Sequence, residues 1–209
     1  MDRSQKIKRR YDRWSRFYDA FDLGGVNDQK RLAVDYLQLE KDAIVLDMGT
    51  GTGAIIPHLA SKLDGGKVIG VDFSEKMVKT ANDRIAKKNI ARKAKAVVAD
   101  GTYLPFPDNH FDAIIATFAF TSFPEPEKAI RECARVLRPG GKFSILDTGK
   151  PQGKRHQFRY RYLKAVMWRA GYTDISLDIP KLVARSGLKV SKVKRFPGSF
   201  GYIVFALKI

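Results

Sequence analysis

The sequence predicts an α/β fold: a doubly wound seven-stranded sheet, mostly parallel, whose last strand is antiparallel. Three observations support it. Apolar runs typical of buried strands alternate with stretches of helical spacing through residues 43–148. The first run leads into a glycine-rich turn that opens a helix. The last two runs, 188–196 and 199–208, are joined only by Pro197 and Gly198, a link too short for a crossover helix, so we expect them to pair antiparallel.

The other elements are expected between and around these features. The five parallel strands are expected at 43–49, 67–73, 94–100, 111–118 and 142–148. The helices are expected at 53–63, 75–89, 125–137 and 178–186. The third of these helices should end before the stop signal Arg138-Pro139-Gly140-Gly141.

Composition limits the kind of protein. The chain has 209 residues, 44% of them hydrophobic, and a formal net charge of +17, which fits one folded, basic domain. The single cysteine, Cys133, excludes an internal disulfide, and no apolar run approaches the roughly 20 residues of a membrane-spanning helix. The charged first residues lack the apolar stretch of a secretory signal. We therefore expect a cytoplasmic protein.

The excess positive charge lies at the two ends of the chain. Residues 1–16 have a net charge of +5 and residues 150–209 have +12, whereas residues 17–149 are neutral. We therefore expect the two ends to build any surface that faces a polyanion, around an electrically balanced middle.

The glycine-rich turn and three aspartates indicate a nucleoside ligand. Glycines in G-x-G-x-G spacing at 49–53 allow the backbone to approach a ligand, and this spacing differs from the G-x-G-x-x-G of dinucleotide-binding folds. Asp47, Asp72 and Asp100 come at the ends of the first three strands, which should share one edge of the sheet. Their carboxylates would accept bonds from an amino group, a ribose and an adenine amine.

Taken in order, these motifs resemble those of the class I S-adenosylmethionine-dependent methyltransferases, which have a Rossmann-like fold. VLDMGTGTG resembles the first motif, VIGVDFSEKMVKTA the ribose motif, and VVADGTYLPFPDNHFDAIIATF the adenine motif with the next strand. FPEPEKAIRECARVLRPGGKFSILD resembles the helix and strand that follow. The resemblance implies that S-adenosyl-L-methionine is the cofactor. Methyl transfer from its sulfonium depends mainly on aligning acceptor, methyl group and sulfur.

The resemblance also implies roles for individual residues. Asp72 would bind the ribose, Asp100 with Gly101 would read the adenine, and Gly49 and Gly51 would lie against the methionine portion. Phe73 and Met77 would flank the adenine, and Thr117 would lie near the sulfonium. The full set expected to bind the cofactor is Tyr11, Tyr18, Asp47, Gly49, Thr50, Gly51, Thr52, Asp72, Phe73, Met77, Asp100, Gly101, Thr102 and Thr117.

Residues 1–25 are expected to form an amphipathic lid helix within the single domain 1–209. Its apolar side chains recur at intervals of three and four residues and form one stripe: Ile7, Tyr11, Trp14, Tyr18 and Phe21. Such a helix suits an anionic headgroup layer and suits equally a lid over the cofactor. The catalytic candidates are Tyr11, Tyr18 and Asp19, and the sequence does not choose among them.

The remainder of the domain is expected to comprise a cofactor-binding core at 40–150 and, at 151–209, an acceptor-side segment with the last two strands. LPFPDNHFD and RVLRPGGKFSILDTGKP resemble the methyltransferases of ubiquinone and menaquinone synthesis. GTGAIIP resembles the bacterial phosphatidylethanolamine N-methyltransferases. The resemblance implies a lipid or lipid-linked acceptor, either a phospholipid amine or a prenylated quinol, and peripheral association with the anionic inner face of a membrane.

A methyltransferase that acts on RNA, on another polyanion or on a small molecule is the alternative. Basic residues interleaved with aromatic ones, as in KPQGKRHQFRYRYLKAVMWR, also bind nucleic acid. Against that alternative, the fourth strand leads into ATFAFTSFPEP, which has no Asn-Pro-Pro-Tyr-like turn to grip a base amine. No group of His, Cys, Asp and Glu has the spacing of metal ligands, so no metal is expected. The sequence leaves the oligomeric state open.

Overall fold

The structure is a computed structural model of the chain, and it describes residues 26–149, 176–196 and 201–209. The strands are β1 (Ile44–Met48), β2 (Lys67–Asp72), β3 (Ala94–Val98), β4 (Phe111–Thr117), β5 (Leu137–Thr148), β6 (Leu188–Arg195) and β7 (Gly201–Lys208). The helices are α2 (Val26–Asp35), α3 (Ile56–Lys62), α4 (Glu75–Lys87), the short 3-10 helix η2 (Phe120–Ser122), α5 (Pro126–Val136) and α7 (Ile179–Arg185).

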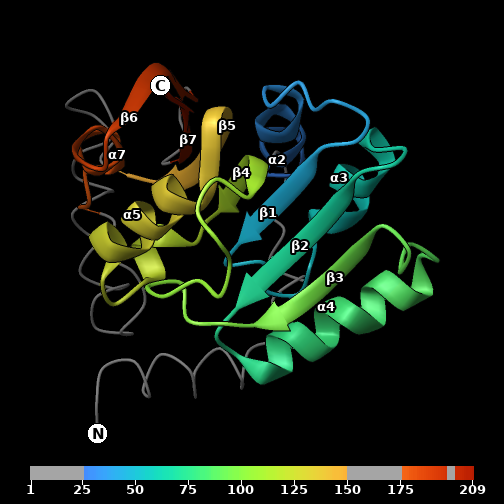
Figure 1. The fold of residues 1–209 in the computed structure, drawn as a ribbon. Coiled ribbons are helices and arrows are strands. Elements are labelled where there is room, and N and C mark those ends of the chain that lie inside the picture. Colours follow the sequence, from blue (N-terminus) through green and yellow to red (C-terminus); the bar gives the residue numbers. More distant parts are fainter. Residues whose placement is uncertain (1–25, 150–175, 197–200) are drawn as a thin grey trace, which may run out of the picture.

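The strands form one sheet in the order β3-β2-β1-β4-β5-β7-β6 (Figure 1). The strands from β3 to β5 in this order are parallel to their neighbours. β7 runs antiparallel to both β5 and β6. The predicted seven-stranded, mostly parallel sheet with an antiparallel last strand is therefore confirmed.

Helices cover both faces of the sheet. On one face, α2, α3 and α4 pack through side chains such as Val34, Leu59 and Ile85 against buried strand residues. On the other face, α5, α7 and the connection from β3 to β4 form the second half of the core, with Phe111 and Ile130 fully buried. The sheet is consequently apolar on both sides, as expected of a doubly wound fold.

The start of β5 differs from the sequence-based prediction. The strand begins at Leu137 rather than at residue 142, so the expected helix-stop signal lies inside it. Leu137 pairs with Phe111, and Gly140, with a φ of 75°, lies where the register between β4 and β5 shifts. Because the glycine accommodates this irregularity, the chain leaves α5 and enters the sheet directly.

Two other boundaries also differ, and one helix was not predicted. α3 begins at Ile56 rather than at residue 53, because Gly53 has a φ of 71°, which is outside the helical region. β3 ends at Val98, so Asp100 lies in the turn that follows. The sequence analysis did not predict α2, although its side chains at Ala33 and Val34 are buried in the core.

Several predictions concern residues outside the described part of the chain. These are the lid helix at 1–25 with Tyr11, Tyr18 and Asp19, and the acceptor-side segment from 150 to 175. Among the described residues, no helix has the length and hydropathy needed to cross a bilayer.

Candidate functional site

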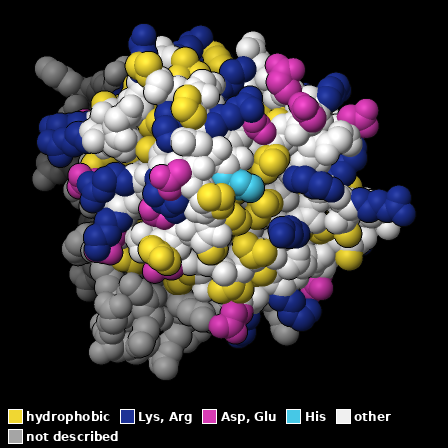
Figure 2. Space-filling model, viewed as in Figure 1, with side chains coloured by type: hydrophobic (Ala, Val, Ile, Leu, Met, Phe, Trp, Pro, Cys, Tyr) yellow, Lys and Arg dark blue, Asp and Glu magenta, His cyan; other side chains and the backbone are white. Residues whose placement is uncertain are grey.

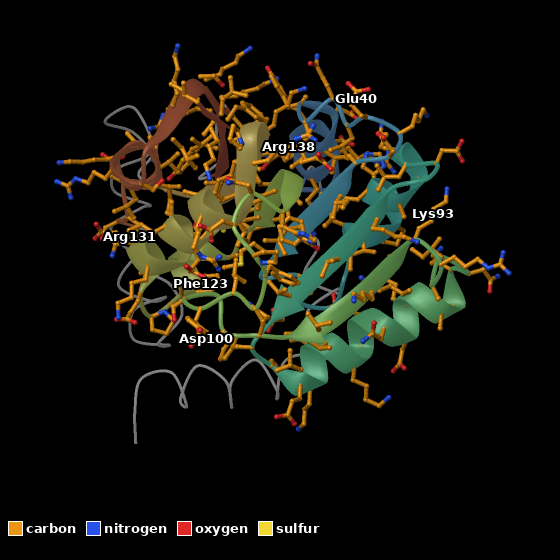
Figure 3. The ribbon with its side chains drawn as sticks, in the orientation of Figure 1. Glu40, Lys93, Asp100, Phe123, Arg131 and Arg138 are labelled. Atoms are coloured by element: carbon orange, nitrogen blue, oxygen red, sulfur yellow. The ribbon has the colours of Figure 1, made fainter. Side chains whose placement is uncertain are left out.

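The carboxyl ends of the first strands meet at one edge of the sheet. Asp72 pairs with Val98 at the end of β3, and Met48 at the end of β1 pairs with Val71. Figure 3 shows Asp100 and Phe123 at this edge, while Glu40, Lys93 and Arg138 lie toward the opposite edge. Parallel α/β sheets bind ligands at their carboxyl edge, so this edge is the candidate site.

The turn after β1 needs glycine at each alternate position. Gly49, Gly51 and Gly53 have φ values of 68°, 55° and 71°. A Cβ on Gly49 would lie 2.6 Å from the Ala119 methyl, and one on Gly53 would lie 2.9 Å from the Ala81 methyl, whereas a Cβ on Gly51 would meet no described residue within 4 Å. Gly49 and Gly53 are therefore required by packing, and no described side chain crowds Gly51.

Asp72 joins the end of β2 to this turn. Its Oδ2 accepts a bond from the backbone N–H of Gly51 at 3.0 Å. Its Oδ1 accepts from the N–H of Ser74 at 2.9 Å, one residue before α4 begins. The side chain is half-buried. The Asp72 carboxylate therefore lies where the end of β2, the glycine turn and the start of α4 meet.

Asp47 lies beneath the turn rather than open to the crevice. Its side chain is fully buried, and its Oδ2 accepts a bond from the Thr50 hydroxyl at 2.5 Å. Oδ1 has no hydrogen-bond partner among the described residues. Burial raises the pKa of Asp47 to about 7, the charge of Asp72 adds to this effect, and the Thr50 hydroxyl and the charge of Lys30 oppose it. The carboxyl therefore exchanges its proton near neutral pH.

The turn after β3 holds Asp100 at the exposed rim. Asp100 Oδ1 accepts bonds from both the backbone N–H and the hydroxyl of Thr102, each at 2.8 Å. Gly101 is buried, and a Cβ there would lie 2.4 Å from the Met48 methyl and 2.5 Å from the Phe123 ring. A larger residue at 101 would have to displace the Met48 and Phe123 side chains.

The other predicted residues also lie around this edge. Met77 is buried in the first turn of α4, and its N–H bonds the Ser74 hydroxyl at 3.2 Å. Phe73, half-buried, directly follows β2, and Thr117, also half-buried, ends β4. Thr52 is buried and accepts a bond from Arg84 on α4 at 3.4 Å. The structure describes twelve of the predicted residues. They lie at the carboxyl ends of β1–β4, in the turns after these strands or in the first turn of α4: Asp47, Gly49, Thr50, Gly51, Thr52, Asp72, Phe73, Met77, Asp100, Gly101, Thr102 and Thr117.

The structure adds a fourth aspartate that the sequence analysis did not select. Asp147, near the end of β5, is fully buried and accepts a bond from the Thr121 hydroxyl at 2.7 Å and from the N–H of Thr148 at 2.7 Å. Burial raises its pKa to about 6 despite these bonds. The signal was present in the sequence, because the expected strand 142–148 ends in Leu-Asp-Thr. Asp147 anchors η2, which follows β4 at the edge of the site.

Residues 46–145, which contain most of these features, match the family described as a methyltransferase domain. These residues form a methyltransferase domain. The expected methyltransferase family is thereby confirmed for this part of the chain.

Curated relatives include enzymes of quinone synthesis. The ubiquinone/menaquinone biosynthesis C-methyltransferase UbiE of Pseudomonas entomophila is 36% identical over 127 residues, which are 60% of this chain and 49% of that protein. UbiE of Azotobacter vinelandii is 34% identical over 123 residues, 58% of this chain and 49% of that protein. The chain thus spans about half the length of the curated relatives it matches.

Solved structures show the same fold. A SAM-dependent methyltransferase from Aquifex aeolicus has a TM-score of 0.69 and 24% identity, with 100% of both chains covered. Geranyl diphosphate C-methyltransferase from Streptomyces coelicolor has a TM-score of 0.71 and 16% identity, with 88% of this chain and 79% of that chain covered. At these identities the likeness establishes the Rossmann-like architecture alone.

The residues of the turn fit the cofactor. Among the described residues, nothing lies within 4 Å of a Cβ at Gly51, which leaves room for a ligand beside the backbone. Asp72 places a carboxylate, an acceptor of the kind that ribose hydroxyls bond, beside the same turn. When bound, S-adenosylmethionine supplies an activated methyl group on a sulfonium.

Proposed function

We propose that this protein uses S-adenosylmethionine to methylate a lipid-linked acceptor at an anionic membrane surface. The single observation that carries the choice of acceptor is the 127-residue match to ubiquinone/menaquinone biosynthesis C-methyltransferases. It favours a prenylated quinol over a phospholipid amine such as phosphatidylethanolamine.

Within this proposal, different residues at the carboxyl edge bind different parts of the cofactor. Asp72 accepts bonds from the ribose, and the Asp100–Gly101 turn reads the adenine. Gly51 gives the methionine portion access to the backbone. The distribution supports these roles, because each residue follows a different strand end along one edge.

The remaining assignments follow from the same arrangement. Phe73 and Met77 flank the adenine, and Thr117 lies near the sulfonium. Tyr11, Tyr18 or Asp19 would take a proton from the acceptor if it needs to lose one before attack.

The distribution of positive charge along the chain supports association with an anionic membrane. Over α5, basic side chains are paired with acidic ones, as in Lys128–Glu125 and Arg131–Glu127. Figure 2 shows this mixture of signs on the face that carries α5. The surplus of positive charge instead belongs to the two ends of the chain, where residues 1–16 contribute +5 and 150–209 contribute +12. Such a cationic surface is attracted to anionic lipid.

The experiment that tests this function supplies the protein with methyl-labelled cofactor and one acceptor at a time. The acceptors are anionic vesicles with a prenylated quinol that lacks one ring methyl group, anionic vesicles with phosphatidylethanolamine, and total RNA. We expect label in the quinol. Label in phosphatidylethanolamine would keep a lipid acceptor but change its class, and label in RNA alone would overturn the proposal.

A further inference from the structure

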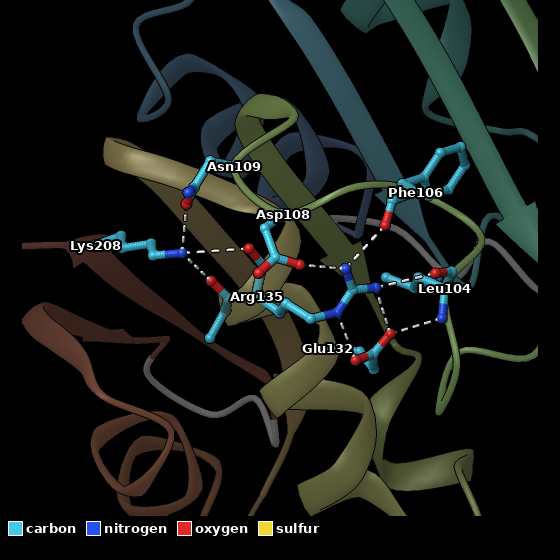
Figure 4. A network of polar contacts seen from close by, with 8 residues as sticks. Leu104, Phe106, Asp108, Asn109, Glu132, Arg135 and Lys208 are labelled. Atoms are coloured by element: carbon cyan, nitrogen blue, oxygen red, sulfur yellow. Dashed lines mark hydrogen bonds and ion pairs between the residues drawn. The ribbon is translucent and has the colours of Figure 1, made fainter.

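A network of polar contacts fixes the connection between β3 and β4, residues 99–110, which crosses one face of the sheet without a helix of its own (Figure 4). Its centre is Arg135 in the last turn of α5. The guanidinium donates to the carbonyl oxygens of Leu104 at 3.0 Å and Phe106 at 2.9 Å, and to the Asp108 carboxylate at 2.7 Å. The Arg135 side chain thus forms hydrogen bonds to three residues of this connection.

Glu132 completes the network from the preceding turn of α5. It accepts two bonds from the Arg135 guanidinium, both at 2.8 Å, and one from the backbone N–H of Leu104 at 2.7 Å. Both backbone polar groups of Leu104 are therefore bonded to this pair of side chains. The Arg135 hydrogen bonds hold the pKa of the Glu132 carboxyl below its usual range, so the pair stays ionised.

The anchored Leu104 lies close in the chain to the adenine turn. The N–H of Tyr103 donates to the Asp100 carbonyl at 3.0 Å, and Thr102 is bonded to the Asp100 side chain. The turn itself rests on Met48 and Phe123 through Gly101. A displacement of Leu104 would therefore be transmitted to Asp100 through a short, internally bonded segment.

We infer that Arg135 is a positioning residue for adenine recognition: with Glu132 it holds the connection 99–110 so that Asp100 and Gly101 keep the geometry that reads the base. This inference rests on the proposed role of the Asp100–Gly101 turn. Arg135 does not touch the cofactor in this account. It acts through Leu104.

The test compares affinities for two ligands by calorimetry. S-adenosylhomocysteine carries the adenine amine, and S-inosylhomocysteine has a carbonyl in its place. We expect Arg135→Met to weaken S-adenosylhomocysteine binding at least tenfold and S-inosylhomocysteine binding much less, so that the preference for adenine falls. Turnover at saturating cofactor should stay within about twofold, because the acceptor side is untouched.

Arg131→Met is the matched control, since Arg131 lies one turn earlier on α5 and, within the described part of the chain, forms its ion pair with Glu127. It should leave both affinities unchanged. If Arg135→Met fails to fold, Arg135→Lys gives the same comparison. Lysine keeps the charge but lacks the planar guanidinium that donates to the carbonyl oxygens of both Leu104 and Phe106. A folded Arg135 variant with the wild-type preference for adenine would overturn the inference.

Asp100→Asn separates this inference from the site assignment. If Asp100→Asn lowers the adenine preference and the Arg135 variants do not, only the role of Arg135 is wrong. If Asp100→Asn also leaves the preference intact, both the adenine turn and the role of Arg135 are wrong.

Discussion

The carboxylate of Asp72 accepts a hydrogen bond from the backbone N–H of Gly51, with 3.0 Å between oxygen and nitrogen. This bond ties the end of β2 to the glycine turn after β1. The same carboxylate bonds Ser74 at the start of α4. Two strand ends and a helix start are therefore held together by one side chain.

Gly51 and Gly49 should respond differently to alanine. Both have positive φ, so alanine costs roughly 1–2 kcal/mol of stability at either position. At Gly49 the new methyl also meets Ala119 at 2.6 Å, so Gly49→Ala should lower the melting temperature more. At Gly51 the methyl meets no described residue, so Gly51→Ala should mainly weaken S-adenosylhomocysteine binding. The distinction between Gly49 and Gly51 would be wrong if both variants lost the same amount of melting temperature and Gly51→Ala bound S-adenosylhomocysteine with wild-type affinity.

The buried Asp47 makes stability depend on pH. Its pKa is raised from 3.8 to about 7 in the folded protein, so protonation favours the folded state. The stability of the wild type should therefore fall as the pH rises from about 4 to about 7, by up to about 4 kcal/mol from this group. Asp47→Asn cannot ionise and should flatten this part of the profile. Denaturant unfolding across the range measures it, and a profile that the substitution leaves unchanged would exclude Asp47 as the cause.

Thr121 should stabilise the ionised form of Asp147. Its hydroxyl donates to that carboxylate at 2.7 Å, so Thr121→Val should raise the pKa of Asp147 above its present value of about 6. The loss of stability should be roughly 1.5–3 kcal/mol at pH 8, where the carboxylate is ionised, and smaller at pH 5. Unfolding measured at both values tests this. A loss that is larger at pH 5 would have the wrong sign for the proposed contact.

The basic residues of 1–16 should govern membrane association. Replacing Lys6, Lys8, Arg9 and Arg10 by glutamine removes four charges, each worth about 1 kcal/mol near an anionic surface. Cosedimentation with phosphatidylglycerol vesicles should fall sharply, and binding to neutral phosphatidylcholine vesicles should stay low throughout. Lys128→Gln with Arg131→Gln is the control, because Glu125 and Glu127 already pair those charges. Equal binding of the wild type to both kinds of vesicle would refute the electrostatic role.

Local patterns predicted most of the fold. Apolar runs place each strand to within a few residues, and the short link at Pro197–Gly198 predicts the antiparallel pairing of β6 with β7. The early start of β5 was missed because a Pro-Gly-Gly signal that ends a helix can also continue into a bulged strand. Only the pairing of Leu137 with Phe111 distinguishes the two outcomes, and that pairing is a tertiary contact.

The candidate site was predicted as a set of residues but not as a geometry. The strand-end rule brings Asp72 and Asp100 to one edge, as the structure has them. It does not foresee that Asp47 is covered by Thr50, because that depends on how the glycine turn folds back. Nor does it reveal Arg135 and Leu104 as partners, since 31 residues separate them in the chain. The roles of Tyr11, Tyr18 and Asp19 stay predictions.

The most direct test of the account is the affinity of S-adenosylhomocysteine for the wild type, Asp72→Ala and Asp83→Ala, measured by calorimetry. Charge-assisted bonds are worth roughly 1.5–3 kcal/mol each, so loss of the two ribose bonds should weaken binding at least tenfold in a folded Asp72→Ala protein. Asp83 is exposed and, among the described residues, pairs with Lys79, so its removal should leave the affinity within about twofold. Wild-type affinity in Asp72→Ala, or no binding by the wild type, would contradict the account.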